Sequence, residues 1–303
     1  MSGDGRPRLT AIVADELAAP VDPAVQAVAA AARAAHGDAV SAVLFYGSCR
    51  RDGYREGMLV DLYVLVDAYA AVHRSRLMRR LNWLMPPNVY YAEAPRAGAT
   101  VRAKYALVSL DQFERRMRFS TSNPYFWARF AQPTGLVWAR DARARAQVTG
   151  ALAQAIATTE RATRPLLGDG ADALDLWTLA LRESYRTELR VEKPHRARAI
   201  VEDDRERWRR VDAALAAGEG ERATETRAQA LRHWRRRRVE GKALSVLRLV
   251  KASFTFAGGA DYIAWKISRH AGAPVEFRAW ERRHPLLAAP VVLWRLARRG
   301  IIR

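Results

Sequence analysis

Residues 40–67 read VSAVLFYGSCRRDGYREGMLVDLYVLVD, and this stretch decides the fold of the first part of the chain. Val40 to Tyr46 is a short apolar run of β-branched and aromatic residues that stops at a glycine, which predicts a buried strand ending in a turn. Met58 to Val66 is a second apolar run, interrupted by one acid at Asp61. The stretch therefore predicts two buried strands joined by the polar, glycine-containing loop 49–57.

The segments on either side of this stretch alternate between helical and extended patterns. The Ala-rich residues 22–36, with Pro23 near the first turn, and residues 69–84 are typical of helices. Residues 88–91 and 101–110 are typical of further strands. This part of the chain therefore predicts a sheet with flanking helices.

The composition changes after Asp141, where Ala, Leu, Arg and Glu dominate and the period becomes helical. We predict an α+β protein whose N-terminal domain, residues 1–140, is a mixed sheet with flanking helices. An all-helical domain follows at residues 141–275, and residues 276–303 form a basic amphipathic tail. The predicted helices of the second domain cover residues 142–166, 170–192, 196–217, 221–256 and 260–270.

The charge of the chain favours a polyanionic partner. The 303 residues include 51 Lys and Arg against 32 Asp and Glu, which gives a formal charge of +19. Nucleic acid, an anionic membrane surface and nucleotide phosphates all suit such an excess. The other explanation for the bulk of this charge is an Arg- and Ala-rich composition of the kind found in chains from GC-rich genomes.

The composition also bears on location. The single cysteine, Cys49, cannot form an internal disulfide, which favours a reducing compartment. No run of 18 or more apolar residues exists, so we expect no transmembrane helix, and residues 1–20 do not resemble a secretory signal. We expect a cytoplasmic protein whose contact with the inner face of the membrane is peripheral.

The segment that ends at Asp67 suits nucleotidyl transfer. A glycine at a tight turn, Gly47, lets backbone N–H groups approach a triphosphate, and the hydroxyl of Ser48 can hydrogen-bond a phosphate oxygen. Carboxylates hold Mg²⁺ against the phosphates, and strand alternation places Asp61 and Asp67 on one face. Two alternatives remain open: an ion pair between Asp61 and an arginine, and a helix N-cap role for Asp67.

This order of residues resembles the nucleotidyltransferase superfamily, in which a strand ends in Gly-Ser or Gly-Gly and the next strand carries Asp-x-Asp or Asp-x-Glu. The chain departs from that pattern at Tyr63, where the second acid would fall. In most branches of the superfamily this departure implies an inactive protein. The resemblance implies a nucleotidyltransferase-type mixed sheet with a site for a nucleotide and Mg²⁺.

Further segments resemble the mitochondrial maintenance-type phosphatidate cytidylyltransferases, which make CDP-diacylglycerol from CTP and phosphatidic acid. The strand of that family also lacks an acid two positions after its Asp, so Tyr63 is compatible with activity. Cys49, where the family usually has Gly, and residues 86–100 depart from its pattern. The matching segments are MLVDLYVLVD, His73, Asn82-Trp83, PPNVYY, RAKYALVSL and Trp127–Trp138, followed by LRESYRTELR and residues 245–272.

The resemblance implies site residues at the matching positions, with Asp61, Ser48 and Lys104 as catalytic residues. CTP and Mg²⁺ are expected at Gly47-Ser48 and Asp61, with Asp67 as a second metal ligand. Lys104 would bind the triphosphate or the lipid phosphate as a compact positive charge, and the alternative is a solvated strand edge. The matched residues are Tyr46, Gly47, Ser48, Asp61, Lys104 and Tyr105.

Two later segments, the one around Arg186 and the C-terminal tail, can each be interpreted in two ways. Arg186 or Glu188 is expected to face a nucleotide cleft between the domains, and the other explanation for both is surface ion pairing along a helix. The tail, residues 276–303, combines Trp294 with several arginines. It suits a helix lying on an anionic bilayer, or it packs on the helical domain.

The leading interpretation is a peripheral, CTP-dependent phosphatidate cytidylyltransferase that uses Mg²⁺. A rival is a nucleotidyltransferase acting on RNA or a small molecule, which the basic run Arg235–Arg238 supports. The chain has no evident array of base-stacking residues, so nucleic acid is the less favoured partner. A third interpretation is an inactive nucleotidyltransferase-fold module that binds membranes or nucleic acid.

Overall fold

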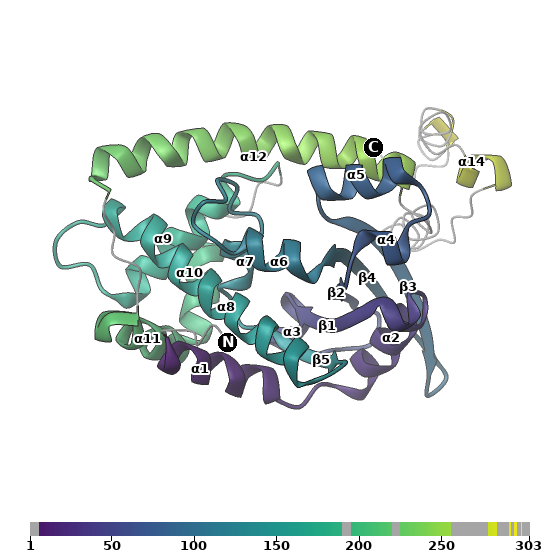
Figure 1. The fold of residues 1–303 in the computed structure, drawn as a ribbon, viewed down its shortest axis with the longest axis horizontal. Coiled ribbons are helices and arrows are strands. Elements are labelled where there is room, and N and C mark those ends of the chain that lie inside the picture. The colour runs from purple at the N-terminus through teal and green to yellow at the C-terminus, as the bar shows by residue number, and fades with distance from the viewer. Residues whose placement is uncertain are drawn as a thin grey trace.

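The computed structural model describes residues 6–189, 195–219, 225–255 and 278–283, together with Val291, Trp294, Arg295 and Arg298. In this part of the chain a five-stranded mixed sheet is followed in sequence by long helices, which confirms the predicted α+β class (Figure 1). The predicted helix 260–270 and most of the predicted tail 276–303 lie outside the described residues.

The sheet has the strand order β3-β4-β2-β1-β5. β2 and β4 are parallel, and the other neighbouring strands are antiparallel. β1 and β2 lie near the centre, where most of their residues are buried on both faces. The strands are β1 (Val40–Tyr46), β2 (Leu59–Val66), β3 (Asn88–Arg96), β4 (Ala99–Ser109) and β5 (Gly135–Ala139).

The helices of the first part of the chain are mostly short. α2 is capped by Asp22, whose carboxylate accepts a 2.6 Å hydrogen bond from the N–H of Ala24, and it packs on the sheet. The single predicted helix 69–84 is wrong, because the chain divides at His73 and begins a second helix that Ser75 caps. These helices are α1 (Pro7–Ala18), α2 (Pro23–Ala34), α3 (Ser48–Asp52), α4 (Tyr69–Val72), α5 (Arg76–Leu84), α6 (Leu110–Arg116) and α7 (Trp127–Phe130).

The predicted elements do not include α1, α3 or β5. α1 buries Leu9, Ile12, Val13 and Leu17, which recur at helical spacing, so its signal is present in the sequence. α3 is a short helix of mostly polar residues inside the predicted loop 49–57, and it starts directly after the turn at the end of β1. β5 is a short edge strand that pairs with β1.

The helices of the second part cover the C-terminal half of the described chain. The predicted helix 196–217 is wrong as one element, because it divides at Asp204. No helix among the described residues is both long enough and apolar enough to cross a bilayer. The helices are α8 (Ala142–Thr163), α9 (Ala173–Tyr185), α10 (Arg196–Asp203), α11 (Arg205–Ala214), α12 (Arg227–Thr255) and α14 (Ala279–Arg283), with short 3₁₀ turns at Gly37–Ala39 and Arg164–Leu166 and a π turn at Leu215–Glu219.

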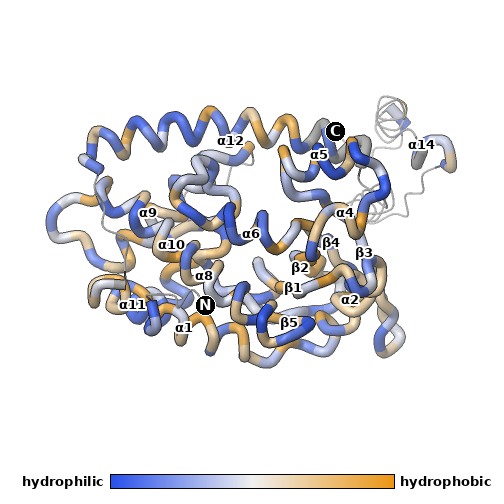
Figure 2. Tube along the Cα trace, viewed as in Figure 1, coloured by the Kyte–Doolittle hydropathy of each residue, from blue (hydrophilic) through white to orange (hydrophobic). Residues whose placement is uncertain are grey.

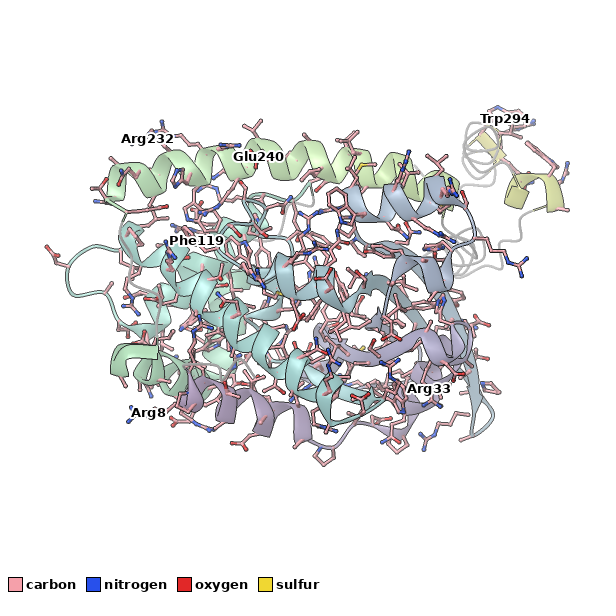
Figure 3. All side chains as sticks on the ribbon, in the orientation of Figure 1. Arg8, Arg33, Phe119, Arg232, Glu240 and Trp294 are labelled. Atoms are coloured by element: carbon pink, nitrogen blue, oxygen red, sulfur yellow. The ribbon has the colours of Figure 1, made fainter. Side chains whose placement is uncertain are left out.

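α12 runs along one side of the molecule, and hydrophilic residues predominate in its N-terminal half (Figures 1 and 2). Its basic run does not all face solvent. The guanidinium of Arg237 is buried 5.2 Å from the ring of Trp234 and 5.6 Å from that of Phe119, whereas Arg232 points away from the body of the protein (Figure 3). Arg238 donates to Glu183 at 2.6 Å. Two of the four arginines in the run Arg235–Arg238 are therefore held by contacts with residues outside α12.

The C-terminal end of α12 is attached to the segment between α5 and β3. Nζ of Lys251 donates to the carbonyl of Pro87 at 3.0 Å and to the side chain of Asn82 at 3.3 Å. Nε of Arg248 donates to the carbonyl of Pro86 at 2.9 Å. Burial, with Arg248 nearby, lowers the pKa of Lys251 to about 8. α12 therefore connects the helices to the sheet.

The middle of α12 approaches the chain after α9 so closely that only a glycine fits. A Cβ on Gly241 would lie 2.5 Å from the carbonyl oxygen of Thr187. We expect Gly241→Ala to lower the free energy of unfolding by about 1–3 kcal/mol, because overpacking outweighs the higher helix propensity of alanine. Urea unfolding measures this.

The matched control is Gly150→Ala in α8, where a Cβ would meet nothing within 4 Å. There the helix propensity acts alone, and the substitution should raise the free energy of unfolding by about 0.5–1 kcal/mol. Equal stabilisation by both substitutions would show that α12 does not approach Thr187 this closely.

Candidate active site

Three side chains lie in one row across the sheet. Antiparallel pairing places Tyr46 opposite Asp61, and parallel pairing places Lys104 opposite Asp61 on its other side. Residues in register share a face, so all three point to the same side of the sheet. Nζ of Lys104 lies 3.0 Å from Oδ1 of Asp61. The ion-pair partner of Asp61 is therefore this lysine on the neighbouring strand rather than an arginine.

The turn after β1 brings the backbone against the same carboxylate. Gly47 has φ +83° and ψ −158°, a backbone conformation that residues other than glycine rarely adopt. A Cβ at this position would lie 3.0 Å from Oδ2 of Asp61. Gly47 is thus required both by the backbone conformation and by the space beside Asp61, and α3 begins immediately after it at Ser48.

Tyr63, which stands where the superfamily pattern has its second acid, belongs to the core. Its side chain is fully buried, and its ring packs edge-on against Phe130 at 4.8 Å and Tyr46 at 5.3 Å. Burial raises the pKa of Tyr63 well above its usual value. The position two residues after Asp61 therefore supports the wall of the site through packing.

Tyr105 directly follows Lys104 in β4, so its side chain points to the opposite face of the sheet. Its partner in β2 is Leu62, and its hydroxyl lies 3.0 Å from Nε2 of His36 on the other face of the sheet. Of the predicted Lys-Tyr pair, only the lysine therefore reaches the row that contains Asp61.

A cavity of about 520 Å³ lies beside this row, within the range of small-molecule sites. The N-terminal part of the chain, up to Lys104, and later segments, from Pro124 onward, both contribute to its wall. The N-terminal part contributes Tyr46, Gly47, Ser48, Arg50, Arg51, Asp61 and Lys104. The later segments contribute Tyr125, Arg129, Tyr185, Glu188, Arg196 and Trp208.

The two parts of the wall differ in chemistry. Beside Ser48 stand the cations Arg50, Arg51 and Lys104, which suit phosphate oxygens. The later segments add aromatic rings that offer stacking surfaces, together with two arginines and the acids Glu188, Asp203 and Asp204. Such a cavity suits a ligand with an anionic end and an aromatic end, as a nucleotide has.

Asp61 is suited to a magnesium ion that a nucleotide brings with it. Oδ1 of Asp61 is buried and accepts no hydrogen bond in the described part of the chain, although Lys104 is close. The described residues contain no cluster of three or more His, Cys, Asp or Glu that could hold a metal by themselves. Mg²⁺ usually binds one or two carboxylates together with substrate phosphates, so one carboxylate is sufficient when the nucleotide is bound.

Asp67, the predicted second metal ligand, does not lie near Asp61. β2 ends at Val66, and six residues of extended chain span about 20 Å at ~3.3 Å per residue. The carboxylate accepts hydrogen bonds from Arg140 at 2.6 Å and from Ser41 at 2.7 Å, and the Arg140 bond lowers the pKa of Asp67. The prediction that Asp61 and Asp67 bind the same metal ion is therefore wrong, because the two carboxylates lie too far apart. The predicted N-cap role is also absent, because Ala68 precedes α4.

Arg186, predicted to bind nucleotide, is not part of the cavity wall. It ends α9 and pairs with Glu183 at 3.0 Å, with a side chain that is 55% exposed. Surface ion pairing, the alternative explanation, describes it correctly. Glu188 lies two residues further along and does line the cavity.

Cys49 is buried behind the turn and donates to the carbonyl of Leu59 at 3.3 Å. Burial, reinforced by the negative charge of Asp61, raises the pKa of this thiol to about 11. A thiol that stays protonated at neutral pH is a poor nucleophile, so Cys49 contributes packing to the site.

Arg129 is one of the cavity residues that the sequence patterns do not single out. It lies in α7, inside the aromatic run from Tyr125 to Phe130, which by itself predicts only core packing. The feature of the sequence that could have indicated this residue is the arginine within an aromatic run, because a charged group among buried rings needs a partner. That partner is Glu188, which lies 59 positions away in sequence.

A scan of the chain against protein-family models gives no match, and a search of curated proteins gives none either. The resemblance to phosphatidate cytidylyltransferases thus rests on the short motifs of the sequence alone, among them those around Gly47-Ser48, Asp61 and Lys104. The function is inferred from these residues and their geometry.

Substitutions at two glycines can distinguish the effect of backbone strain from the effect of crowding beside Asp61. Gly53, at φ +77° and ψ 153°, resembles Gly47 in having a positive φ that favours glycine, but a Cβ on it would meet nothing within 4 Å. Replacing either glycine with alanine should cost about 1–3 kcal/mol of stability through backbone strain. Only Gly47→Ala should also weaken binding of CTP with Mg²⁺, because its methyl group displaces the carboxylate of Asp61. Urea unfolding and titration calorimetry measure the two effects.

Equal affinities of the Gly47→Ala and Gly53→Ala variants for CTP with Mg²⁺ would mean that the space beside Asp61 is not part of a nucleotide site.

Proposed function

We propose that the chain is a nucleotidyltransferase-type enzyme, a phosphatidate cytidylyltransferase that makes CDP-diacylglycerol and pyrophosphate from CTP and phosphatidic acid. The observation that carries this proposal is the convergence of Gly47-Ser48, Asp61 and Lys104 on the wall of one cavity. These are the positions that the resemblance to that family implies. The mixed sheet, with a Gly-Ser turn after one central strand and an acid on the next, supports a nucleotidyltransferase-type fold.

The residues around the turn would bind the triphosphate. The hydroxyl of Ser48 donates to a phosphate oxygen, and Lys104, Arg50 and Arg51 supply positive charge. Mg²⁺, held by Asp61 and the phosphates, would supply further charge neutralisation at the reacting phosphorus. Lys104 keeps the Asp61 carboxylate oriented toward the cavity from 3.0 Å away.

The acceptor in this reaction is itself a phosphate. An oxygen of phosphatidate forms a bond to the α-phosphorus of CTP, and the bond from that phosphorus to the bridging oxygen breaks, which releases pyrophosphate. A phosphate monoester is already anionic near pH 7, since its second pKa is about 6. A strong general base is therefore unnecessary, and positioning and charge neutralisation provide the catalysis.

A face of α5 supports an anionic membrane surface as the partner, with the protein bound peripherally to the inner face of the membrane. Leu77, Trp83 and Leu84 are 64%, 54% and 61% exposed. Arg76 and Arg80 are exposed beside them, and the helix contains no Asp or Glu. Exposed apolar side chains with a tryptophan and basic neighbours suit the interface of an anionic bilayer. The predicted membrane-binding tail, residues 276–303, lies largely outside the described residues.

The basic run in α12 gives less support to RNA as the substrate. Arg237 is buried, Arg236 pairs with Glu240 at 2.5 Å and Arg238 pairs with Glu183 at 2.6 Å. None of these three arginines lines the cavity that contains Gly47-Ser48, so they would not contact an acceptor phosphate there. We therefore favour a lipid phosphate as the acceptor.

Replacing the central carboxylate tests the proposal. Asp61→Asn should reduce formation of CDP-diacylglycerol from CTP and phosphatidate at least about 100-fold, because it removes the charge that holds Mg²⁺. Asp67→Asn, which changes the same group at the other end of β2, is the control and should retain activity. The measurement follows labelled CTP into the lipid product.

Two other outcomes would replace this assignment. Incorporation of label into RNA, with none into phosphatidate, would favour a nucleotidyltransferase that acts on RNA. Release of no pyrophosphate with any acceptor, and nucleotide binding that Asp61→Asn leaves unchanged, would favour an inactive binding module.

A triple substitution on α5 tests the membrane proposal. Replacing Leu77, Trp83 and Leu84 with serine should weaken binding to vesicles that contain phosphatidic acid by about 100-fold or more, because insertion of each apolar side chain contributes about 1 kcal/mol or more. Co-sedimentation with vesicles measures the affinity. Leu231→Ser with Val239→Ser, at exposed positions on α12, is the control and should bind as the wild type does.

Unchanged vesicle binding by the triple variant would exclude α5 as the docking face. Activity toward a water-soluble, short-chain phosphatidate should survive the triple substitution, since α5 does not line the cavity.

A further inference from the structure

An arginine–glutamate pair in the cavity has no part in the phosphate chemistry described so far. Nη2 of Arg129 lies 3.0 Å from Oε1 of Glu188, and Nη1 of Arg129 donates to the hydroxyl of Tyr125 at 3.2 Å. The side chains of Arg129 and Glu188 are 22% and 33% exposed. Both line the cavity that also contains Gly47-Ser48.

The pair is surrounded by aromatic rings. The guanidinium of Arg129 lies 4.3 Å from the ring centre of Tyr125 and 5.7 Å from that of Tyr46. Tyr185 and Trp208 line the same cavity. Aromatic faces beside a fixed donor and a fixed acceptor are what a planar heterocycle requires for stacking and for recognition of its edge.

The fold holds the two side chains firmly. Arg129 belongs to α7, whose neighbouring residues Trp127 and Phe130 are fully buried. Glu188 follows Thr187, whose carbonyl oxygen is the atom that Gly241 of α12 approaches. Three separate elements thus fix the position of the pair, and precise recognition of a ligand depends on such preorganisation.

An ion pair at this depth adds little stability, because the cost of removing two charges from water offsets much of their attraction. Apolar side chains of similar size would fill the same space. A polar pair that faces a cavity is therefore better explained by a ligand than by folding.

We propose that Arg129 and Glu188 recognise the base edge of the bound nucleotide and select cytosine. This inference rests on the proposed function, because it assumes that the triphosphate lies at Gly47-Ser48. Arg129 would donate to O2 and N3 of cytosine, and Glu188 would accept from the amino group at C4. Arg129 and Glu188 are specificity-determining residues in this arrangement.

The order of donors and acceptors gives the pair its selectivity. From the sugar outward, cytosine presents acceptor, acceptor and donor, which two N–H groups and a carboxylate match. Uracil presents acceptor, donor and acceptor, so its N3–H would face Arg129 and its O4 would face the Glu188 carboxylate. Unmatched polar groups in a desolvated site reduce affinity strongly.

Nucleotide competition tests the inference. The wild type should bind CTP with Mg²⁺ about 10- to 100-fold more tightly than UTP with Mg²⁺, as expected for a charge-assisted hydrogen bond worth about 1.5–3 kcal/mol. Glu188→Gln should lower this ratio, because the amide can rotate to donate to O4 of uracil, whereas the mismatch between N3–H and Arg129 stays. Arg129→Lys should also lower the ratio, since a lysine cannot present two parallel donors. Titration calorimetry measures each affinity.

The matched control is Asp203→Asn, which removes another carboxylate of the cavity wall. Asp203 lies 3.8 Å from Arg51, on the side of the phosphate-binding residues. Its substitution should change the affinities for CTP and UTP by the same factor. Thermal unfolding of every variant identifies any that fail to fold.

The outcomes separate this inference from the proposed function. Losses that are equal for CTP and UTP in both Glu188→Gln and Arg129→Lys would overturn base recognition, even if CDP-diacylglycerol is formed. A preference for CTP over UTP in the wild type that both substitutions reduce would support base recognition, even if no lipid product is formed. No binding of either nucleotide by the wild type would overturn both.

Discussion

The contact between Asp61 and Lys104 is the interaction on which the candidate site depends. An unpaired carboxylate inside an apolar strand is costly, and the parallel pairing of β2 with β4 places a lysine at 3.0 Å to offset that cost. The antiparallel pairing with β1 places Gly47 against the other oxygen of the same carboxylate. Three strands therefore converge on one charged group, and that group lies at the wall of the cavity.

Segments after β4 complete the cavity. α7 supplies Arg129, and the chain after α9 supplies Glu188. α12 connects these parts, because Gly241 packs against Thr187 while Lys251 and neighbouring residues hold its C-terminal end to the α5–β3 segment. Side chains that approach a ligand from both the sheet and the helices can enclose it, which strengthens electrostatic interactions in the site.

The sequence was informative where chemistry and local pattern agree. The apolar runs predicted β1 and β2, the Gly-Ser turn fell where β1 ends, and Asp61 was recognised as an unusual acid in a buried strand. It was misleading where a partner distant in sequence decides the role. The sequence predicts Asp67 as a metal ligand, yet Arg140 and Ser41 bind it. It predicts Arg186 as a nucleotide-binding residue, yet Glu183 pairs with it. It gives no indication of Arg129, because the partner Glu188 is 59 positions away.

The sequence by itself determined the α+β class, the central strands and the Gly47–Asp61 constellation, because these depend on periodicity and on residue types within a short segment. Only the tertiary structure decided that Lys104 pairs with Asp61, that Tyr63 belongs to the core and that Arg129 and Glu188 share the cavity. Strand order, register and helix packing bring these groups together. The physical reason is that such contacts depend on which distant segments meet, and no local pattern specifies that.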